Sequence, residues 1–147
     1  AIEMLKAVQL HWNICSYGIF SAAVADYRPK SVADQKIKKN DDELSIELIK
    51  NPDILKWAGD TKSSDQLLVG FALETSHLLE NGKKKLAKKN LNLIVLNTLE
   101  DKGAGFGVDT NKISILDNHN NLAEFELKSK KEVASDIVSH LKMYISK

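Results

Sequence analysis

The stretch of residues 20–39 constrains the fold of this chain more than any other feature. It reads FSAAVADYRPKSVADQKIKK, in which a run of small apolar residues leads into Asp26, then Pro29 and a cluster of lysines. A continuous apolar run is typical of a strand that is buried on both faces of an α/β sheet. Because ligands bind beyond the carboxyl ends of such strands, the pattern predicts a carboxylate and cations beside a metal-bound phosphate ligand.

The composition narrows the class of protein. The 147 residues are enough for one domain with a sizeable core. The net charge of +1 gives no reason to expect nucleic acid or a membrane surface as a partner, so an anion site must be local. The single cysteine, Cys15, excludes an internal disulfide and, with no signal peptide in view, predicts a cytoplasmic protein. No apolar run approaches the roughly 20 residues of a membrane span.

Hydrophobic periodicity predicts alternating helices and strands. Helices are predicted over residues 2–12, 52–57, 78–89 and 131–145. Strands are predicted over residues 17–25, 67–73, 91–96, 112–116 and 123–127, the last two as a hairpin. Two successive strand–helix–strand steps predict an α/β fold with a Rossmann-like, mostly parallel sheet in three layers.

Residues 30–50 are predicted to leave this sheet as an excursion. Apolar residues recur at every second position over residues 44–48, which predicts a strand. That strand is expected to pair back on residues 36–39, so the excursion would protrude as a β-hairpin.

Asp26 is the first candidate for chemistry. A lone Asp at a strand end is usually just solvated. Its case as a Mg²⁺ ligand is strengthened by Lys36, Lys38 and Lys39, which lie on a downstream loop able to fold back and neutralise phosphates. Both interpretations remain open at this point.

The sequence Asn51-Pro52-Asp53 predicts the start of a helix. Asn51 is expected to cap it, Pro52 suits its first turn, and Gly59 is expected to end it. The free backbone N–H groups of the first turn could bind an anion or a nucleotide hydroxyl, but an ordinary helix cap is the favoured interpretation.

Other features also have a structural and a functional interpretation. Phe71 either belongs to the core or stacks on a base, and the core is favoured. Lys85 and Lys89 lie one turn apart on one helix face, which is usually solvated but could clamp phosphates. The glycine-rich loop 103–107 lacks a dinucleotide-binding pattern, which argues against a generic NAD(P) protein. The four histidines and Cys15 lack metal-ligand spacing.

Five motifs follow one another in a specific order. They are AAVADYRP at 22–29, KIKK at 36–39, NPDIL at 51–55, VGFALET at 69–75 and KLAKKNLNLIVLN at 85–97. In order and spacing they closely resemble the phosphopantothenate-cysteine ligase domain of bacterial coenzyme A biosynthesis, over essentially the whole chain. In many bacteria this domain is fused to a flavin-dependent decarboxylase domain, which the resemblance implies as a further part of the intact protein.

The resemblance implies a two-step ligation that uses CTP and Mg²⁺. The carboxylate of 4'-phosphopantothenate attacks the α-phosphorus of CTP to give an acyl-cytidylate and pyrophosphate. The amine of L-cysteine then displaces CMP and gives 4'-phosphopantothenoyl-L-cysteine. The implied CTP contacts are Asp26, Lys36, Pro52, Asp53, Ile54, Leu55, Phe71, Lys85 and Lys89. Among them Asp26 is the implied metal ligand, and Lys36 and Lys85 are the implied catalytic cations.

The resemblance also implies a homodimer. Residues 30–50 are the implied dimerisation excursion, which would deliver Lys36 across the interface. The family's domain also has a strand, a Gly-rich turn and an Asn-containing segment ahead of the matching region, and these are not among residues 1–147. We therefore expect a single, partial ligase domain with an exposed apolar sheet edge. The alternative is a non-catalytic fragment of that ligase that binds a nucleotide or forms dimers.

Overall fold

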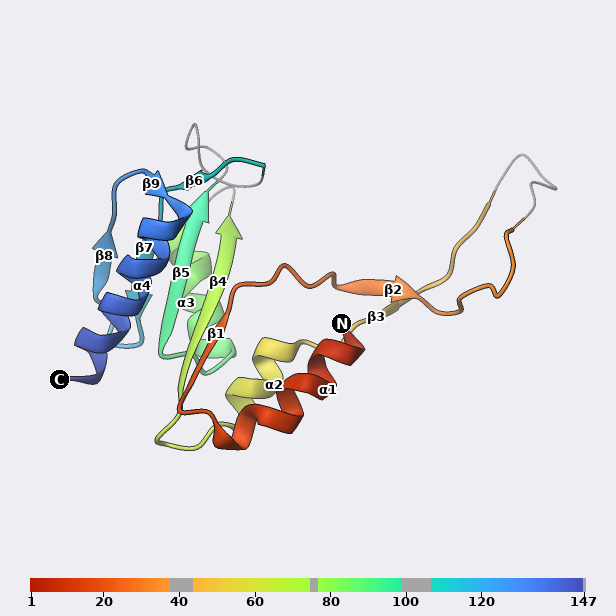
Figure 1. Ribbon diagram of the computed structural model, residues 1–147, viewed down its shortest axis with the longest axis horizontal. Helices are drawn as coiled ribbons and strands as arrows, with labels where there is room; N and C mark the ends of the chain where they lie inside the picture. Colours follow the sequence, from red (N-terminus) through yellow and green to blue (C-terminus); the bar gives the residue numbers. More distant parts are fainter. Residues whose placement is uncertain (38–43, 75–76, 99–106, 147) are drawn as a thin grey trace.

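A computed structural model describes residues 1–37, 44–74, 77–98 and 107–146 (Figure 1). The helices are α1 (Ile2–His11), α2 (Ile54–Thr61), α3 (Leu78–Lys88) and α4 (Lys130–Ile145), and a short 3₁₀ turn, η1 (Trp12–Ile14), follows α1. The strands are β1 (Tyr17–Phe20), β2 (Tyr27–Pro29), β3 (Leu48–Lys50), β4 (Leu67–Glu74), β5 (Leu93–Thr98), β6 (Thr110–Asn111), β7 (Ser114–Asp117), β8 (Leu122–Glu124) and β9 (Lys128–Ser129).

The central sheet has the order β1-β4-β5-β7-β8. β1, β4 and β5 run parallel, whereas β7 and β8 join as an antiparallel hairpin at one side. Helices α1, α2 and α3 cover one face of the sheet and α4 covers the other (Figure 1). The predicted α/β fold with a mostly parallel, three-layer sheet is therefore confirmed.

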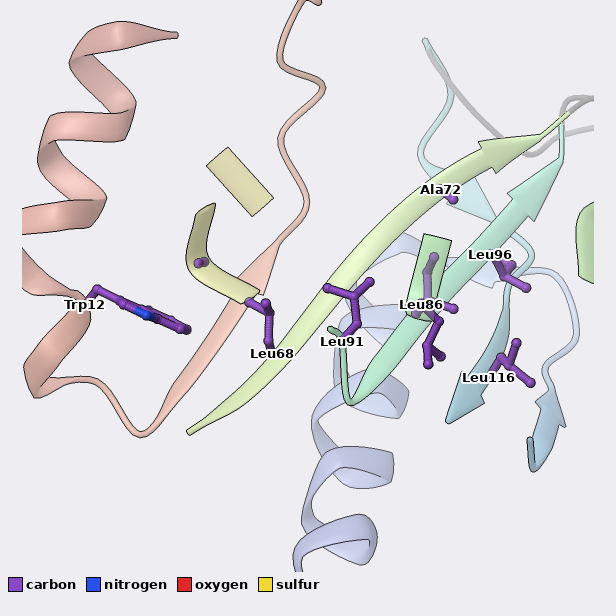
Figure 2. Close-up of a cluster of buried hydrophobic side chains, with 9 residues drawn as sticks. Trp12, Leu68, Ala72, Leu86, Leu91, Leu96 and Leu116 are labelled. Atoms are coloured by element: carbon purple, nitrogen blue, oxygen red, sulfur yellow. The ribbon is translucent and has the colours of Figure 1, made fainter. Parts of the chain in front are cut away.

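β4 carries the core because it is buried on both faces. Leu68 and Ala72 point into the cluster under α1, α2 and α3, which Figure 2 shows together with Trp12. Val69, between them, points into the second cluster under α4. Leu68 and Val69 are completely buried. Burial of each such aliphatic side chain stabilises the fold by about 2 kcal/mol. Because its side chains are buried on both faces, β4 holds the helices of both layers against the sheet.

The first predicted strand is shorter than expected. β1 ends at Phe20, opposite Gly70 of β4, so residues 21–25 lie outside the sheet. Apolar character alone cannot tell a strand from an extended segment that packs on side chains, and the ladder with β4 continues only as far as Phe20. The prediction of a strand over 17–25 was wrong for its second half.

The excursion has a different pairing from the predicted one. β3 pairs with β2 in an antiparallel ribbon, with Arg28 opposite Ile49. The pairing of 44–48 with 36–39 is not observed for the described residues, and residues 38–43 lie outside them. The ribbon extends away from the sheet together with residues 30–37 and 44–47 (Figure 1). We call residues 27–50 the arm.

α2 begins and ends at other residues than predicted. Asp53, rather than Asn51, caps it, because its side chain accepts a hydrogen bond from the backbone N–H of Lys56. Gly59 lies inside the helix and does not end it. A Cβ at Gly59 would overlap the backbone carbonyl oxygen of Lys89, so glycine is needed there for close packing.

The turn between β7 and β8 is held by a buried carboxylate. Asp117 is 3% exposed. One of its oxygens accepts the backbone N–H groups of His119 and Asn121, and the other accepts the side-chain amide of Asn121. Burial raises the pKa of Asp117, but these hydrogen bonds outweigh burial, so its pKa lies below the ordinary value of 3.8.

We predict that Gly59→Ala destabilises the protein by about 3 kcal/mol, because the added methyl group meets rigid backbone. Gly82→Ala is the matched control, since Gly82 is also inside a helix but its added Cβ meets only the tips of Leu96, at 2.9 Å. Leu96 is completely buried, but the ends of its side chain can adjust more easily than backbone, so the control should lose less stability, about 1 kcal/mol. Urea unfolding measures both, and equal losses would refute the proposed backbone contact.

Asp117→Asn is expected to make the free energy of unfolding less dependent on pH in the acidic range. A carboxylate with a lowered pKa contributes stability above 3.8, and loses it as the pH falls through the folded-state pKa. The stability gap between wild type and variant should therefore be largest near neutral pH and shrink below 3.8. Urea unfolding at several pH values measures it, with the exposed Asp65→Asn as control. A gap that stays constant in acid would contradict the assignment.

Candidate functional site

A cavity of about 330 Å³ lies between the end of β1, the start of α2 and β4. We call it the α2 cavity. Its lining includes Asp26, Pro52, Asp53, Ile54, Leu55, Phe71 and Lys89, which are seven of the nine residues predicted as nucleotide contacts. Segments far apart in the sequence therefore converge at the carboxyl edge of the parallel strands, where α/β proteins bind ligands.

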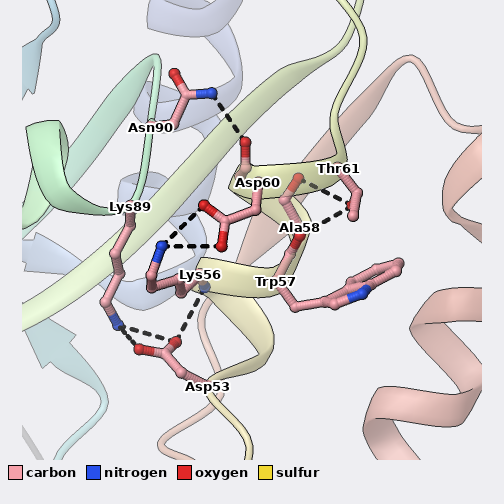
Figure 3. Close-up of polar contacts among 9 residues, drawn as sticks. Asp53, Lys56, Trp57, Ala58, Asp60, Thr61, Lys89 and Asn90 are labelled. Atoms are coloured by element: carbon pink, nitrogen blue, oxygen red, sulfur yellow. Dashed lines mark hydrogen bonds and ion pairs between the residues drawn. The ribbon is translucent and has the colours of Figure 1, made fainter.

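Asp53 and Lys89 form an ion pair at this cavity (Figure 3). Lys89 Nζ lies 2.9 Å and 3.1 Å from the two carboxylate oxygens of Asp53. Burial raises the pKa of Asp53, but the backbone hydrogen bond from Lys56 and the charge of Lys89 outweigh it, so the pKa of Asp53 is lowered. Asp53 is thus ionised at neutral pH and holds the Lys89 ammonium at the cavity wall.

A second cavity of about 630 Å³ lies beside the first, under α4. We call it the α4 cavity. Ala22, Ala23 and Phe71 line both cavities, so only a thin partition of small side chains and one ring separates them. Phe71 is half-buried and also packs on the core under α4, so the favoured core interpretation and the ligand interpretation both fit its position.

Lys85 belongs to the α4 cavity and not to the α2 cavity. Its ammonium is 2.5 Å from the carboxylate of Glu74 at the end of β4. Asn81 donates a hydrogen bond to the other oxygen of Glu74, at 2.9 Å. Two polar contacts therefore hold Glu74, and Glu74 in turn restricts where the Lys85 ammonium can lie.

Some predicted site residues are not brought to either cavity. Lys36 is exposed on the arm and lines neither cavity in this single chain. Lys38 and Lys39 lie outside the described residues. Asp26 lines the α2 cavity but is exposed, six residues beyond the end of β1.

The sequence did not point to several residues of these cavities. Asn51 is buried where the arm meets α2, and Asn97, Asn111 and Lys130 line the α4 cavity. The periodicity of the sequence does not indicate Asn97, Asn111 and Lys130, because they come from different elements that only the sheet topology brings together. Asn51 was predicted only as a helix cap.

The described residues contain no group of three or more His, Cys, Asp or Glu side chains able to hold a metal ion. Two carboxylates, Asp26 and Asp53, line the α2 cavity, and because Asp53 is paired with Lys89, Asp26 is the one available as a metal donor. Such a donor suits Mg²⁺, which usually takes one or two carboxylates together with a substrate's phosphates and waters. Within the same ranges, none of the helices combines the length and apolar character needed to span a bilayer.

The fold and the cavities define an α/β protein whose pockets open at the carboxyl edge of a mostly parallel sheet. Within this class, the family model described as the DNA/pantothenate metabolism flavoprotein C-terminal domain matches residues 1–144. The chain therefore belongs to this family.

Curated relatives and solved structures agree with that family. The chain is 42% identical over 141 residues to the coenzyme A biosynthesis bifunctional protein CoaBC of Bacillus subtilis, which is 96% of this chain and 34% of that protein. It is 49% identical over 138 residues to a cysteine/cysteine sulfinic acid decarboxylase from an unknown prokaryotic organism, which is 94% of this chain and 38% of that protein. The chain thus spans about a third of the length of these relatives.

The crystal structure of the C-terminal domain of CoaBC has the same fold. It superposes with a TM-score of 0.78 at 36% identity, covering 99% of this chain and 63% of that chain. The structure of Cab2 H337A in complex with phosphopantothenate-cysteine has a TM-score of 0.60 at 19% identity, covering 86% of this chain and 44% of that chain, and supports the fold alone.

Proposed function

We propose that this chain carries the nucleotide-binding part of a ligase of coenzyme A biosynthesis. The reaction joins 4'-phosphopantothenate to L-cysteine at the expense of CTP through an acyl-cytidylate. One observation carries the proposal: seven of the nine residues expected to contact CTP line a single cavity, although they come from four separate stretches of chain. The names of the CoaBC relatives, which state coenzyme A biosynthesis, agree with it.

The chemistry of the α2 cavity suits a nucleotide. Ile54, Leu55 and Phe71 supply apolar surface, which a base or ribose can cover. The start of α2 presents free backbone N–H groups, and Lys89 presents an ammonium, both of which favour phosphate oxygens. A bound triphosphate would compete with Asp53 for Lys89, so the ion pair would loosen as phosphate takes over the cation.

Asp26 is the residue that would hold Mg²⁺ together with the nucleotide's phosphates. When bound, the ion supplies charge neutralisation of the triphosphate. The chain's own residues then align the reactants. Lys89 in the α2 cavity and Lys85 in the α4 cavity bind negatively charged groups of the reactants from two sides of the partition. Ala22 and Ala23 are small and leave room for a second substrate to approach. The α4 cavity, with Lys85 and Lys130, offers space and cations for the anionic acid substrate.

The arm supports the proposal of a homodimer. Val32, Ile37, Leu44, Ile46 and Leu48 are each more than half exposed, which is an unusual number of exposed aliphatic side chains for one segment. A second copy would cover them and bring Lys36 to the neighbouring site, which this chain alone does not do. We keep the prediction that residues 30–50, which make up most of the arm, are the dimerisation excursion of a single, partial and cytoplasmic ligase domain.

A second candidate function is a nucleotide-binding or dimerisation module without catalysis. It is favoured by the exposure of Tyr17 and Ile19 on β1, which lies at the edge of the sheet in the described residues. The two candidates differ in one product. The intact protein with CTP and 4'-phosphopantothenate releases pyrophosphate if it is the ligase, and releases none if it only binds. The relative named as a decarboxylase is matched over 38% of its length, so its name says little about the matched part.

We predict that Asp26→Asn and Lys85→Ala each lower kcat of the intact protein by about 100-fold, because each removes a charge that aligns or neutralises phosphates. The matched controls are Asp65→Asn and Lys88→Ala, which are exposed and line neither cavity. Pyrophosphate release measures the rate, and calorimetry with Mg²⁺ and either CTP or ATP measures binding and nucleotide choice. Wild-type rates in both site variants would refute these site assignments.

Leu44→Asp combined with Ile46→Asp is expected to weaken the dimer by at least about 100-fold, since buried charge opposes association. Ile14→Asp is the control, because Ile14 is 83% exposed and lies outside the arm. Sedimentation of the intact protein measures the mass. A dimer that persists in the double variant, or dissociates equally in the control, would contradict the role of the arm.

A further inference from the structure

Asn51 lies at the junction of the arm, the α2 cavity and α2. It directly follows β3 and is only 9% exposed. Its side-chain Nδ2 donates to the backbone carbonyl of Ala25 at 2.8 Å, and its Oδ1 accepts from Arg28 at 3.0 Å. A buried amide with both ends paired is costly to rotate or replace.

The two partners allow only one orientation of the amide. A carbonyl oxygen can only accept and a guanidinium can only donate, so a flipped Asn51 would lose both bonds. Arg28 is itself fixed, because the same guanidinium nitrogen also donates to the backbone carbonyl of Lys50 at 3.0 Å. The arm therefore sets the orientation of the Asn51 amide through Arg28.

The bonds of Asn51 join two neighbouring stretches of chain that line the α2 cavity, residues 25–26 and residues 51–55. Its backbone N–H donates to the carbonyl of Asp26 at 2.7 Å, beside the side-chain bond to Ala25. Ala25 and Asp26 line the cavity on the segment that follows β1, and Asn51 lines it together with residues 52–55, into which it leads. Residues 21–25 lie outside the central sheet, so the position of Asp26 depends on such bonds.

We propose that Asn51 is a positioning residue of the nucleotide site, and that Arg28 couples its orientation to the arm. The inference rests on the proposed function, because it assumes that the α2 cavity binds Mg²⁺ and CTP. Asn51 does not need to touch the ligand. It holds the segment carrying Asp26 at the distance from α2 at which a metal-bound triphosphate fits between them.

Asn51→Asp tests the inference with almost no change of shape. The variant keeps the acceptor for Arg28 but replaces the donor to Ala25 with a carboxylate oxygen facing a carbonyl. We expect calorimetry on the intact protein to give a dissociation constant for CTP, in saturating Mg²⁺, at least about tenfold higher than that of wild type. A dissociation constant within twofold of wild type would overturn the inference.

Gln66→Glu is the matched control. Gln66 is also a buried amide, 8% exposed, whose Nε2 donates to the backbone carbonyls of Trp12 and Cys15, outside both cavities. It makes the same chemical change and should lower the melting temperature, yet leave the dissociation constant for CTP unchanged. An equal loss of CTP affinity in the control would mean that general destabilisation is the cause, and would overturn the inference.

Two further results separate the possible failures. If wild type does not bind CTP in Mg²⁺, the proposed function fails and the inference fails with it. Because Asn51→Asp also adds a negative charge to the cavity lining, Arg28→Met is measured beside it. Arg28→Met removes the group that orients the amide, keeps the bond to Ala25 and adds no negative charge. We expect at least a threefold rise in the dissociation constant for CTP in that variant, and an unchanged value would overturn the inference.

Discussion

The contact between α2 and the end of α3 determines where the candidate site lies. Gly59 allows the backbone of α2 to touch the carbonyl of Lys89, and the side chain of Asn90 donates to the Gly59 carbonyl at 2.8 Å (Figure 3). At the other end of α2, its N-cap residue Asp53 forms an ion pair with the side chain of Lys89. Both the start of α2 and its last turn therefore contact the end of α3, and the contact at the start of α2 supplies Asp53 and Lys89 to the α2 cavity, so packing and charge at this site are not independent.

The parallel strands supply another part of the lining of the α2 cavity. β1 and β4 run toward the same edge of the sheet, but β1 ends opposite Gly70 while β4 continues to Glu74. The chain beyond β1 lines the α2 cavity together with Phe71 before it reaches Asp26. Two cavities result, because Ala22 and Ala23 are too small to fill the space beside that ring. A ligase that activates an acid with a nucleotide needs two adjoining compartments for the two reactants, and this arrangement offers them.

The arm links this site to the proposed dimer. Its base, β2 and β3, is joined to the cavity by Arg28 and Asn51, while its outer part exposes aliphatic side chains. Dimer formation would thus act on the nucleotide site in two ways: by bringing Lys36 from the partner subunit, and by holding the base of the arm in one register. A chain of hydrogen bonds between a contact surface and a site is a physical basis for such coupling.

Much of the fold follows from local sequence, since helix and strand periodicity and five ordered motifs were sufficient to predict the α/β sheet and the family. Asp26, Asp53 and Lys89 could also be named as candidate nucleotide contacts from the sequence alone. Tertiary structure alone decided that Gly59 lies within α2, that β3 pairs with β2, and that Lys85 and Lys89 serve different cavities. It also brought Asn51 into contact with Ala25 and Arg28. The physical reason is that periodicity reports which face of an element is buried, whereas these features depend on contacts between segments distant in sequence, which no local pattern encodes.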